Sequence, residues 1–103
     1  MIVVSDSSPI LNLAVVKKLD LLRDLYREIV VPPSVEQELL RNGVQLDPSW
    51  TRTIAPQNRN DVAALCEQLD PGEAESIVVA TEMKAGLLLI DEAVGSRSTA
   101  VWK

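Results

Sequence analysis

Histidine is absent from this sequence of 103 residues, and cysteine occurs once, as Cys66. The absence of histidine excludes zinc sites of the Cys/His type, histidine triads and histidine as a general base. A single cysteine excludes a disulfide framework within the chain. Because Cys66 follows an apolar helical segment, we expect it to be a small buried hydrophobic residue rather than a reactive thiol. The catalytic groups that remain are carboxylates, hydroxyls, lysine and arginine.

Long hydrophobic runs are also missing. The first six residues, MIVVSD, lack the basic segment of a signal peptide, and no later stretch approaches the length of a membrane span. We therefore expect a cytoplasmic protein that does not associate with membranes. The chain is 47% hydrophobic, which suffices for one core, and it contains no internal repeat. These features indicate a single domain over residues 1–103.

The charge balance is acidic, with a formal net charge of −5 at pH 7. Proteins that bind nucleic acid normally use clustered lysine and arginine against the phosphates, so this balance does not by itself indicate a nucleic-acid enzyme. It suits a metal-binding cluster of acids, and a solvated acidic surface explains it equally well.

Two segments are apolar throughout, Ile2–Val4 and Leu87–Ile90, and both are predicted to be central strands buried on two faces. Further strands are predicted at 28–31 and, on an edge, at 52–54. Helical spacing predicts helices over residues 7–14, 19–26, 33–40, 61–69 and 73–85, with a turn at 70–72. Alternating strands and helices favour a three-layer α/β/α domain with a mostly parallel central sheet.

Carboxylates follow both predicted central strands, as Asp6 after the first and Asp91-Glu92 after the second. Ligands of parallel sheets bind beyond the carboxyl ends of the strands, so Asp6 and Asp91 are expected to face one crevice. Packed carboxylates repel each other unless a hard cation neutralises them, and Mg²⁺ or Mn²⁺ suits oxygen ligands. An acid at a strand end is also a common helix cap, but Ser7 and Ser8 are able to cap the next helix themselves.

Two pairs of glutamates pose a choice. Glu36 and Glu38 lie two residues apart on one predicted helix and point in nearly opposite directions, so at most one faces the crevice. We choose Glu38 and expect Glu36 to be solvated. Glu73 and Glu75 both lie in the first turn of their helix, where acids interact favourably with the helix dipole without any metal. Periodicity does not decide between them.

Three motifs together resemble the PIN-domain superfamily, specifically its VapC-like group of toxin nucleases. The motifs are Val4–Leu13 (VSDSSPILNL), Val31–Leu39 (VPPSVEQEL) and Leu69–Glu75 (LDPGEAE), the last running on to Leu89–Glu92 (LIDE). The resemblance covers residues 1–95. It implies a nuclease that uses one or two Mg²⁺ or Mn²⁺ ions to hydrolyse single-stranded RNA, and an antitoxin protein as partner.

The resemblance also assigns roles to residues. It carries Asp6, Glu38, Glu73 and Asp91 into the catalytic and metal-binding positions, with Glu75 and Glu92 as alternates if the register shifts. Ser7 and Ser8 would contact the metal shell or the scissile phosphate, Asn12 would face the site, and Arg97 is a further candidate for substrate binding. An ordinary polar helix residue remains the alternative for Asn12.

The last residues, 96–103, resemble no part of the family pattern. Members of the family usually continue with another strand and a final helix, so we expect a domain that lacks both. The apolar sheet surface exposed by their loss would favour association of chains, and we therefore expect a homo-oligomer. We expect both tryptophans, Trp50 and Trp102, to serve core or interface packing rather than base stacking.

Two other readings of the residues stay open. One is a truncated and inactive PIN fragment that serves as an oligomerising or protein-binding module. The other is a phosphoryl-transfer domain with Asp6 as nucleophile, which is weaker because Ser8 stands where that class of phosphatase has a second aspartate.

Overall fold

A computed structural model describes residues 1–91 and 99–102 of the chain, with side chains as far as residue 90. A five-stranded sheet has the order β3-β2-β1-β4-β5. Its strands are β1 (Val3–Ser5), β2 (Ile29–Val31), β3 (Thr51–Thr53), β4 (Leu87–Asp91) and β5 (Thr99–Trp102). The first four run parallel, and β5 runs antiparallel to β4. The predicted mostly parallel α/β architecture is confirmed.

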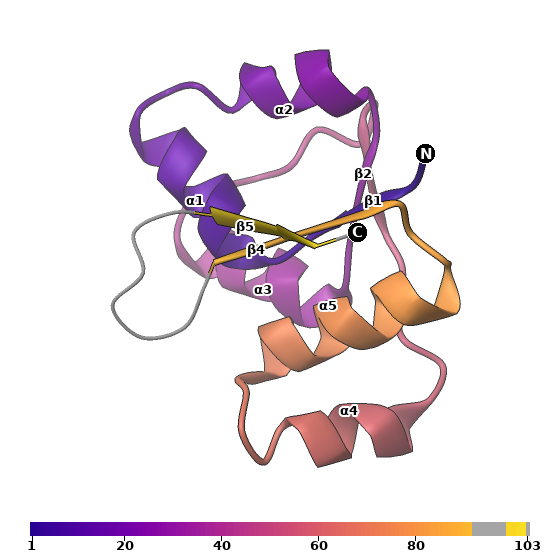
Figure 1. Ribbon diagram of the computed structural model, residues 1–103. Coiled ribbons are helices and arrows are strands. Elements are labelled where there is room, and N and C mark those ends of the chain that lie inside the picture. The colour runs from indigo at the N-terminus through magenta and orange to yellow at the C-terminus, as the bar shows by residue number, and fades with distance from the viewer. Residues whose placement is uncertain (92–98, 103) are drawn as a thin grey trace.

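Five helices cover the two faces of this sheet (Figure 1). They are α1 (Ser7–Val15), α2 (Asp20–Tyr26), α3 (Pro33–Arg41), α4 (Arg59–Leu65) and α5 (Pro71–Glu82). The first three share one core cluster with the sheet, whereas α5 packs on the opposite face and α4 packs on α5. None of the helices in the described ranges has both the length and the apolar character that a membrane span requires.

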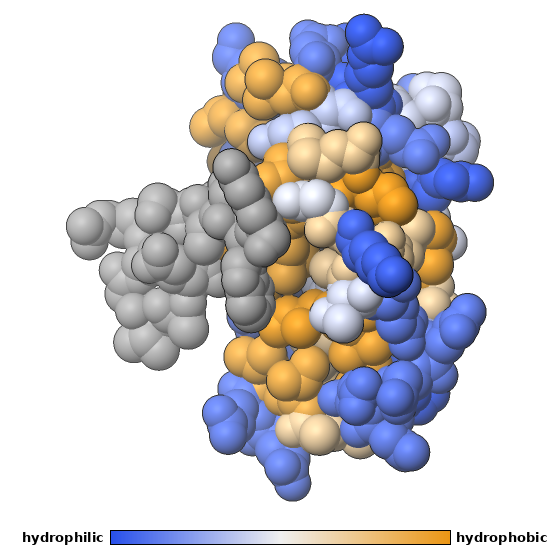
Figure 2. Space-filling view, turned by 45° about the vertical axis from the view of Figure 1, so that its right-hand side comes forward, coloured by the Kyte–Doolittle hydropathy of each residue, from blue (hydrophilic) through white to orange (hydrophobic). Residues whose placement is uncertain are grey.

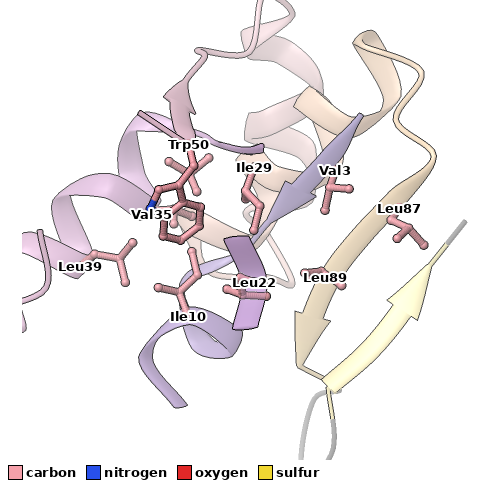
Figure 3. Packing of buried hydrophobic residues seen from close by; sticks show 10 residues of the cluster. Val3, Ile10, Leu22, Ile29, Val35, Leu39, Trp50, Leu87 and Leu89 are labelled. Atoms are coloured by element: carbon pink, nitrogen blue, oxygen red, sulfur yellow. The ribbon is translucent and has the colours of Figure 1, made fainter. Parts of the chain in front are cut away.

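Alternation along the central strands sends side chains into two separate cores. Val3, Leu87 and Leu89 point toward α1, α2 and α3, whereas Val4 and Leu88 point toward α5. Figure 3 shows the larger cluster, which combines side chains of the helices and strands and includes Trp50. Trp50 is 6% exposed, so the expected packing role is confirmed for this tryptophan. Both faces of the central strands are therefore apolar, as the unbroken hydrophobic runs predicted.

Several predicted boundaries were wrong. The expected turn at residues 70–72 is already helical from Pro71, because Asp70 caps the helix by accepting a hydrogen bond from Glu73 N at 2.8 Å. This helix ends at Glu82 rather than near residue 85, with Lys84 at a positive φ of 53°. The preceding helix ends at Leu65, and Cys66 beyond it is exposed, so the expectation of a buried cysteine was wrong.

The end of the chain contributes a strand that the sequence pattern did not predict. Thr99–Trp102 forms β5, and its register pairs Asp91 with Thr99 and Leu88 with Trp102. The expectation of a domain without a further strand after β4 was therefore wrong for this segment. The reason is that an edge strand of four residues is specified mainly by the strand it pairs with, and too little sequence is present for a periodic pattern.

Candidate active site

Asp6 lies at the carboxyl end of β1, between two neighbouring elements. Its backbone N–H donates to Leu89 O at 2.9 Å, which joins the end of β1 to β4. Asp6 is also the N-cap residue of α1, one position before the predicted serine cap, yet its side chain forms no capping hydrogen bond with the described first turn of this helix. The residue is only 3% exposed. A carboxyl group has thus been buried at the topological switch point of the sheet, where ligands of such folds bind.

Gly72 in the first turn of α5 allows the helix to approach this carboxyl group closely. A Cβ atom at Gly72 would lie 3.2 Å from Asp6 Oδ1, 3.4 Å from Val35 Cγ2 and 3.5 Å from Asp70 Oδ1. The lack of a side chain therefore lets β1, α3 and α5 converge at one point. The carboxylates of Asp6 and Asp70 both lie beside it.

Glu73 belongs to the same acidic group. Its pKa is raised from 4.5 to about 7, first by burial and then by the neighbouring carboxyl of Asp70 and the charge of Asp6. Like charges raise a carboxyl pKa because the second ionisation must work against the first. Two of the four predicted metal-binding acids, Asp6 and Glu73, are thus brought close enough to repel each other.

Glu75 has a different environment, although it lies only two residues from Glu73. Its Oε1 accepts a hydrogen bond from Ser34 N at 3.1 Å, and its Oε2 accepts one from Arg59 Nη1 at 3.2 Å. The Glu75 side chain is 6% exposed. Both carboxylate oxygens therefore serve to connect α5 with the first turn of α3 and with α4. Glu73 and Glu75 thus have different surroundings, a difference that helical periodicity could not predict.

In the other pair the structure gives a side-chain partner to Glu36, and the choice of Glu38 for the site stays a prediction. Glu36 Oε2 accepts from Thr53 Oγ1 at 2.9 Å, so this side chain reaches toward the edge strand β3. Glu38 is half-buried and lies one helical turn after Val35, the residue that approaches Gly72. Residues three apart share a helix face, so Glu38 is on the side of α3 that faces α5.

The remaining predicted residues lie in different surroundings. Ser7 is 3% exposed directly beside Asp6, Ser8 is half-buried, and Asn12 is exposed on α1. The backbone of Asp91 ends β4, two residues beyond Leu89, so it stands at the same edge of the sheet as Asp6. The side chain of Asp91 lies outside the described residues, as do Glu92 and Arg97.

The chemistry of these acids fits a hard divalent cation, since their carboxylates and the hydroxyls of Ser7 and Ser8 offer oxygen ligands. Burial is the main cause of the raised pKa of Glu73, and the charges of Asp70 and Asp6 add to it; a bound cation would offset both costs. Among the side chains described, no group of three or more aspartate, glutamate, cysteine or histidine residues is gathered tightly enough to hold a metal. The described part of the site therefore brings Asp6 and Glu73 close together. Glu38 belongs to the neighbouring helix α3, and Asp91 ends the neighbouring strand β4.

Two residues of this region were not predicted. Asp70, read as part of a turn, is the nearest acidic neighbour of Glu73, and an Asp-Pro pair before a helical pattern is a recognisable start signal that points to it. Arg59 contacts Glu75 from another helix, and no local pattern indicates a contact between residues 16 apart in the chain.

An open pocket of about 770 Å³ lies elsewhere, along the second half of α1, the start of α2 and the segment after α3. Its lining includes Leu11, Val15, Leu19 and Val44. None of the predicted acids lines it. The hollow surface and the acidic edge are thus two different places in the described structure.

The parallel sheet, with the buried carboxyl of Asp6 at the end of its central strand β1, defines an α/β domain with an acid where such folds bind their ligands. A family model described as PIN domain matches residues 2–101 of the chain. The chain belongs to the PIN-domain family, whose members have nuclease-type functions that generally depend on divalent metal. Comparison with curated proteins and with solved structures found no match.

Proposed function

We propose that this PIN domain is an endoribonuclease that cleaves single-stranded RNA with Mg²⁺ or Mn²⁺ held by Asp6, Glu38, Glu73 and Asp91. The observation that carries the proposal is the buried carboxyl of Asp6, which meets the first turn of α5 closely enough to help raise the pKa of Glu73 to about 7. Two acids forced together at the carboxyl edge of a parallel sheet suit a cation that carries phosphodiester chemistry.

In this proposal the acids bind the metal ion and the serine hydroxyls bind the substrate. A bound divalent cation supplies Lewis acidity that lowers the pKa of a water molecule and offsets charge on the leaving oxygen. Asp6 and Glu73 hold the charge that attracts the cation, and burial around Asp6 limits competing water. Ser7 and Ser8 begin α1 directly beside Asp6, and in this proposal their hydroxyls would donate to the scissile phosphate.

The proposal extends to the biological role of the protein. We infer a toxin of the toxin-antitoxin type, which acts in the cytoplasm and is held inactive by an antitoxin protein. Apolar side chains support association with other chains: Val15 is 80% exposed and Leu25 69% exposed. Figure 2 shows apolar side chains gathered through the middle of one face, between hydrophilic ends. A homo-oligomer would cover such surface, and a clean monomer by solution mass measurement would contradict it.

The experiment that tests the proposal is cleavage of a mixed single-stranded RNA pool with Mn²⁺, with Mg²⁺ and with chelator. Metal-dependent cutting is expected, and Asp6→Ala should slow it at least about a hundredfold, since loss of a group that only supports a metal ligand already costs 10–100-fold. Absence of cutting with either metal would exclude the nuclease proposal and favour a binding module. A single-stranded DNA pool run in parallel tests the choice of RNA.

A matched pair on α3 tests the site. Glu38→Gln should lower the cleavage rate at least about tenfold, because a charged oxygen donor is lost. Glu36→Gln makes the same chemical change two residues away, where the side chain bonds Thr53, and should leave the rate within about twofold. Equal effects of the two substitutions would contradict the assignment of Glu38.

A further inference from the structure

Arg59 stands out among the arginines because a buried acid holds it. Its Nη1 donates to Glu75 Oε2 at 3.2 Å, and the side chains are 62% exposed for Arg59 and 6% for Glu75. In the other arginine ion pairs of the described residues, Arg23 and Arg52 pair with acids that are themselves exposed. One edge of the Arg59 guanidinium is therefore held by Glu75, while most of the Arg59 side chain faces solvent.

The point of attachment adjoins the acidic edge of the sheet. The other oxygen of Glu75 accepts from Ser34 N at 3.1 Å. The next residue, Val35, lies 3.4 Å from the position that a Cβ atom on Gly72 would take, and Asp6 Oδ1 lies 3.2 Å from the same position. The ion pair of Arg59 is thus joined, through Glu75 and Ser34, to the part of α3 that borders Gly72 together with the carboxyl of Asp6.

The acids near Asp6 would repel the phosphates of an RNA substrate. An RNA strand that reaches Asp6 brings phosphates toward a region that already contains Asp70 and Glu73, in a chain of net charge −5. Repulsion of the substrate backbone must be offset by a cation near the acids. Arg59 has the required position, and Glu75 engages one of its five N–H donors.

We propose that Arg59 binds a non-bridging phosphate oxygen of single-stranded RNA beside the acidic edge, in a manner independent of base sequence. The inference rests on the proposed function. The planar guanidinium presents N–H pairs that match two phosphate oxygens, and Glu75 holds it so that little side-chain freedom is lost on binding. Arg59 is therefore a substrate-binding residue in addition to being the partner of a buried acid.

Binding of a fluorescent mixed-sequence single-stranded RNA, followed by anisotropy in chelator over a range of salt concentrations, tests this role. Arg59→Gln should weaken binding about tenfold and reduce the salt dependence of the logarithm of the binding constant by about 0.7, the slope for one phosphate of a single strand. Arg59→Lys should lie between, because a lysine keeps the charge without the planar fork. Arg52→Gln is the matched control, since Arg52 is equally exposed and pairs with exposed Glu28; it should bind like the wild type.

A second variant separates binding from folding. Arg59→Gln leaves the buried Glu75 carboxylate without its cation and can destabilise the protein, whereas Arg59→Gln with Glu75→Gln removes both charges. The double variant should be as weak in RNA binding as the single one. Wild-type affinity and salt slope in either folded variant would overturn the inference, as would a wild type that binds no RNA.

The outcomes also distinguish this inference from the proposed function. Wild-type cleavage together with unchanged RNA binding in Arg59→Gln removes the role of Arg59 and leaves the nuclease in place. RNA binding that depends on Arg59, in a wild type that cuts nothing with Mn²⁺ or Mg²⁺, supports the role of Arg59 and removes the nuclease.

Discussion

The two ends of the central sheet differ in what they bury. At the carboxyl end of the strands the described structure buries polar side chains, namely Ser5, Asp6, Ser7, Glu75 and Ser76. At the amino end it leaves apolar ones on the surface, with Met1 81% exposed and Ile2 39% exposed. Buried polar groups lower stability unless they are satisfied, and in the described structure they gather at the edge where the proposed function has its chemistry. Stability is supplied by the two sheet faces, and the proposed site lies at one end.

The largest expected effect is a loss of stability when the core on one face of the sheet is disrupted. Leu39 is fully buried in the cluster around Trp50, whereas the next residue, Leu40, is 55% exposed. Leu39→Ala should lower the free energy of unfolding by about 2–5 kcal/mol, because buried area is lost and a cavity remains. Leu40→Ala should change it by less than about 0.5 kcal/mol. Urea unfolding followed by circular dichroism measures both, and similar losses would show that the exposed face of α3 is covered in solution.

Two glycines provide the next test, one at each end of the sheet. A Cβ atom at Gly72 would press on Asp6 Oδ1 at 3.2 Å, and the buried carboxyl would have to move by a few tenths of an ångström. Because small misplacements of reacting groups are costly, Gly72→Ala should slow RNA cleavage about tenfold.

Gly86→Ala is the control at the amino end. Its Cβ atom would overlap the side chain of Met1, which is exposed and turns aside easily. Cleavage by this variant should match the wild type. If both variants cut RNA at the wild-type rate, close approach of α5 to Asp6 does not matter for the chemistry.

The smallest expected effect concerns pH. The folded chain raises the pKa of Glu73 from 4.5 to about 7, so between these values it holds a proton that the unfolded chain has released. The free energy of unfolding should therefore fall as pH rises from about 4.5 through about 7, by under about 1 kcal/mol once solvent screening of this half-exposed group is allowed for.

Chemical unfolding in chelator at pH 4 and pH 8 checks this sign. Glu73→Gln should stabilise the protein at pH 8 relative to the wild type and leave it unchanged at pH 4. A stability difference that is the same at both pH values would mean that burial and the charges of Asp70 and Asp6 do not raise the pKa of Glu73.

The faces of the sheet could be predicted from the sequence, and the connections at its carboxyl end could not. Unbroken apolar runs specify strands such as β4 because both sides are buried. Helical spacing indicated that Glu36 and Glu38 point in different directions, and the choice of Glu38 for the site stays a prediction. The contacts of Glu75 with Ser34 and Arg59 join three helices from two different crossovers. Such contacts depend on how helices pack after the sheet forms, and local periodicity carries no signal for them.

The pairing of β1 with β4 has a consequence for the order in which the site comes into being. Val3 pairs with Leu87, so β1 gains this neighbour only after all the residues between them have been synthesised. Contacts so distant in sequence form slowly, because a long loop must close first. A nascent chain therefore carries Asp6 without the strand that bears Asp91 until β4 has been made. The timing of translation itself keeps these two acids apart until then.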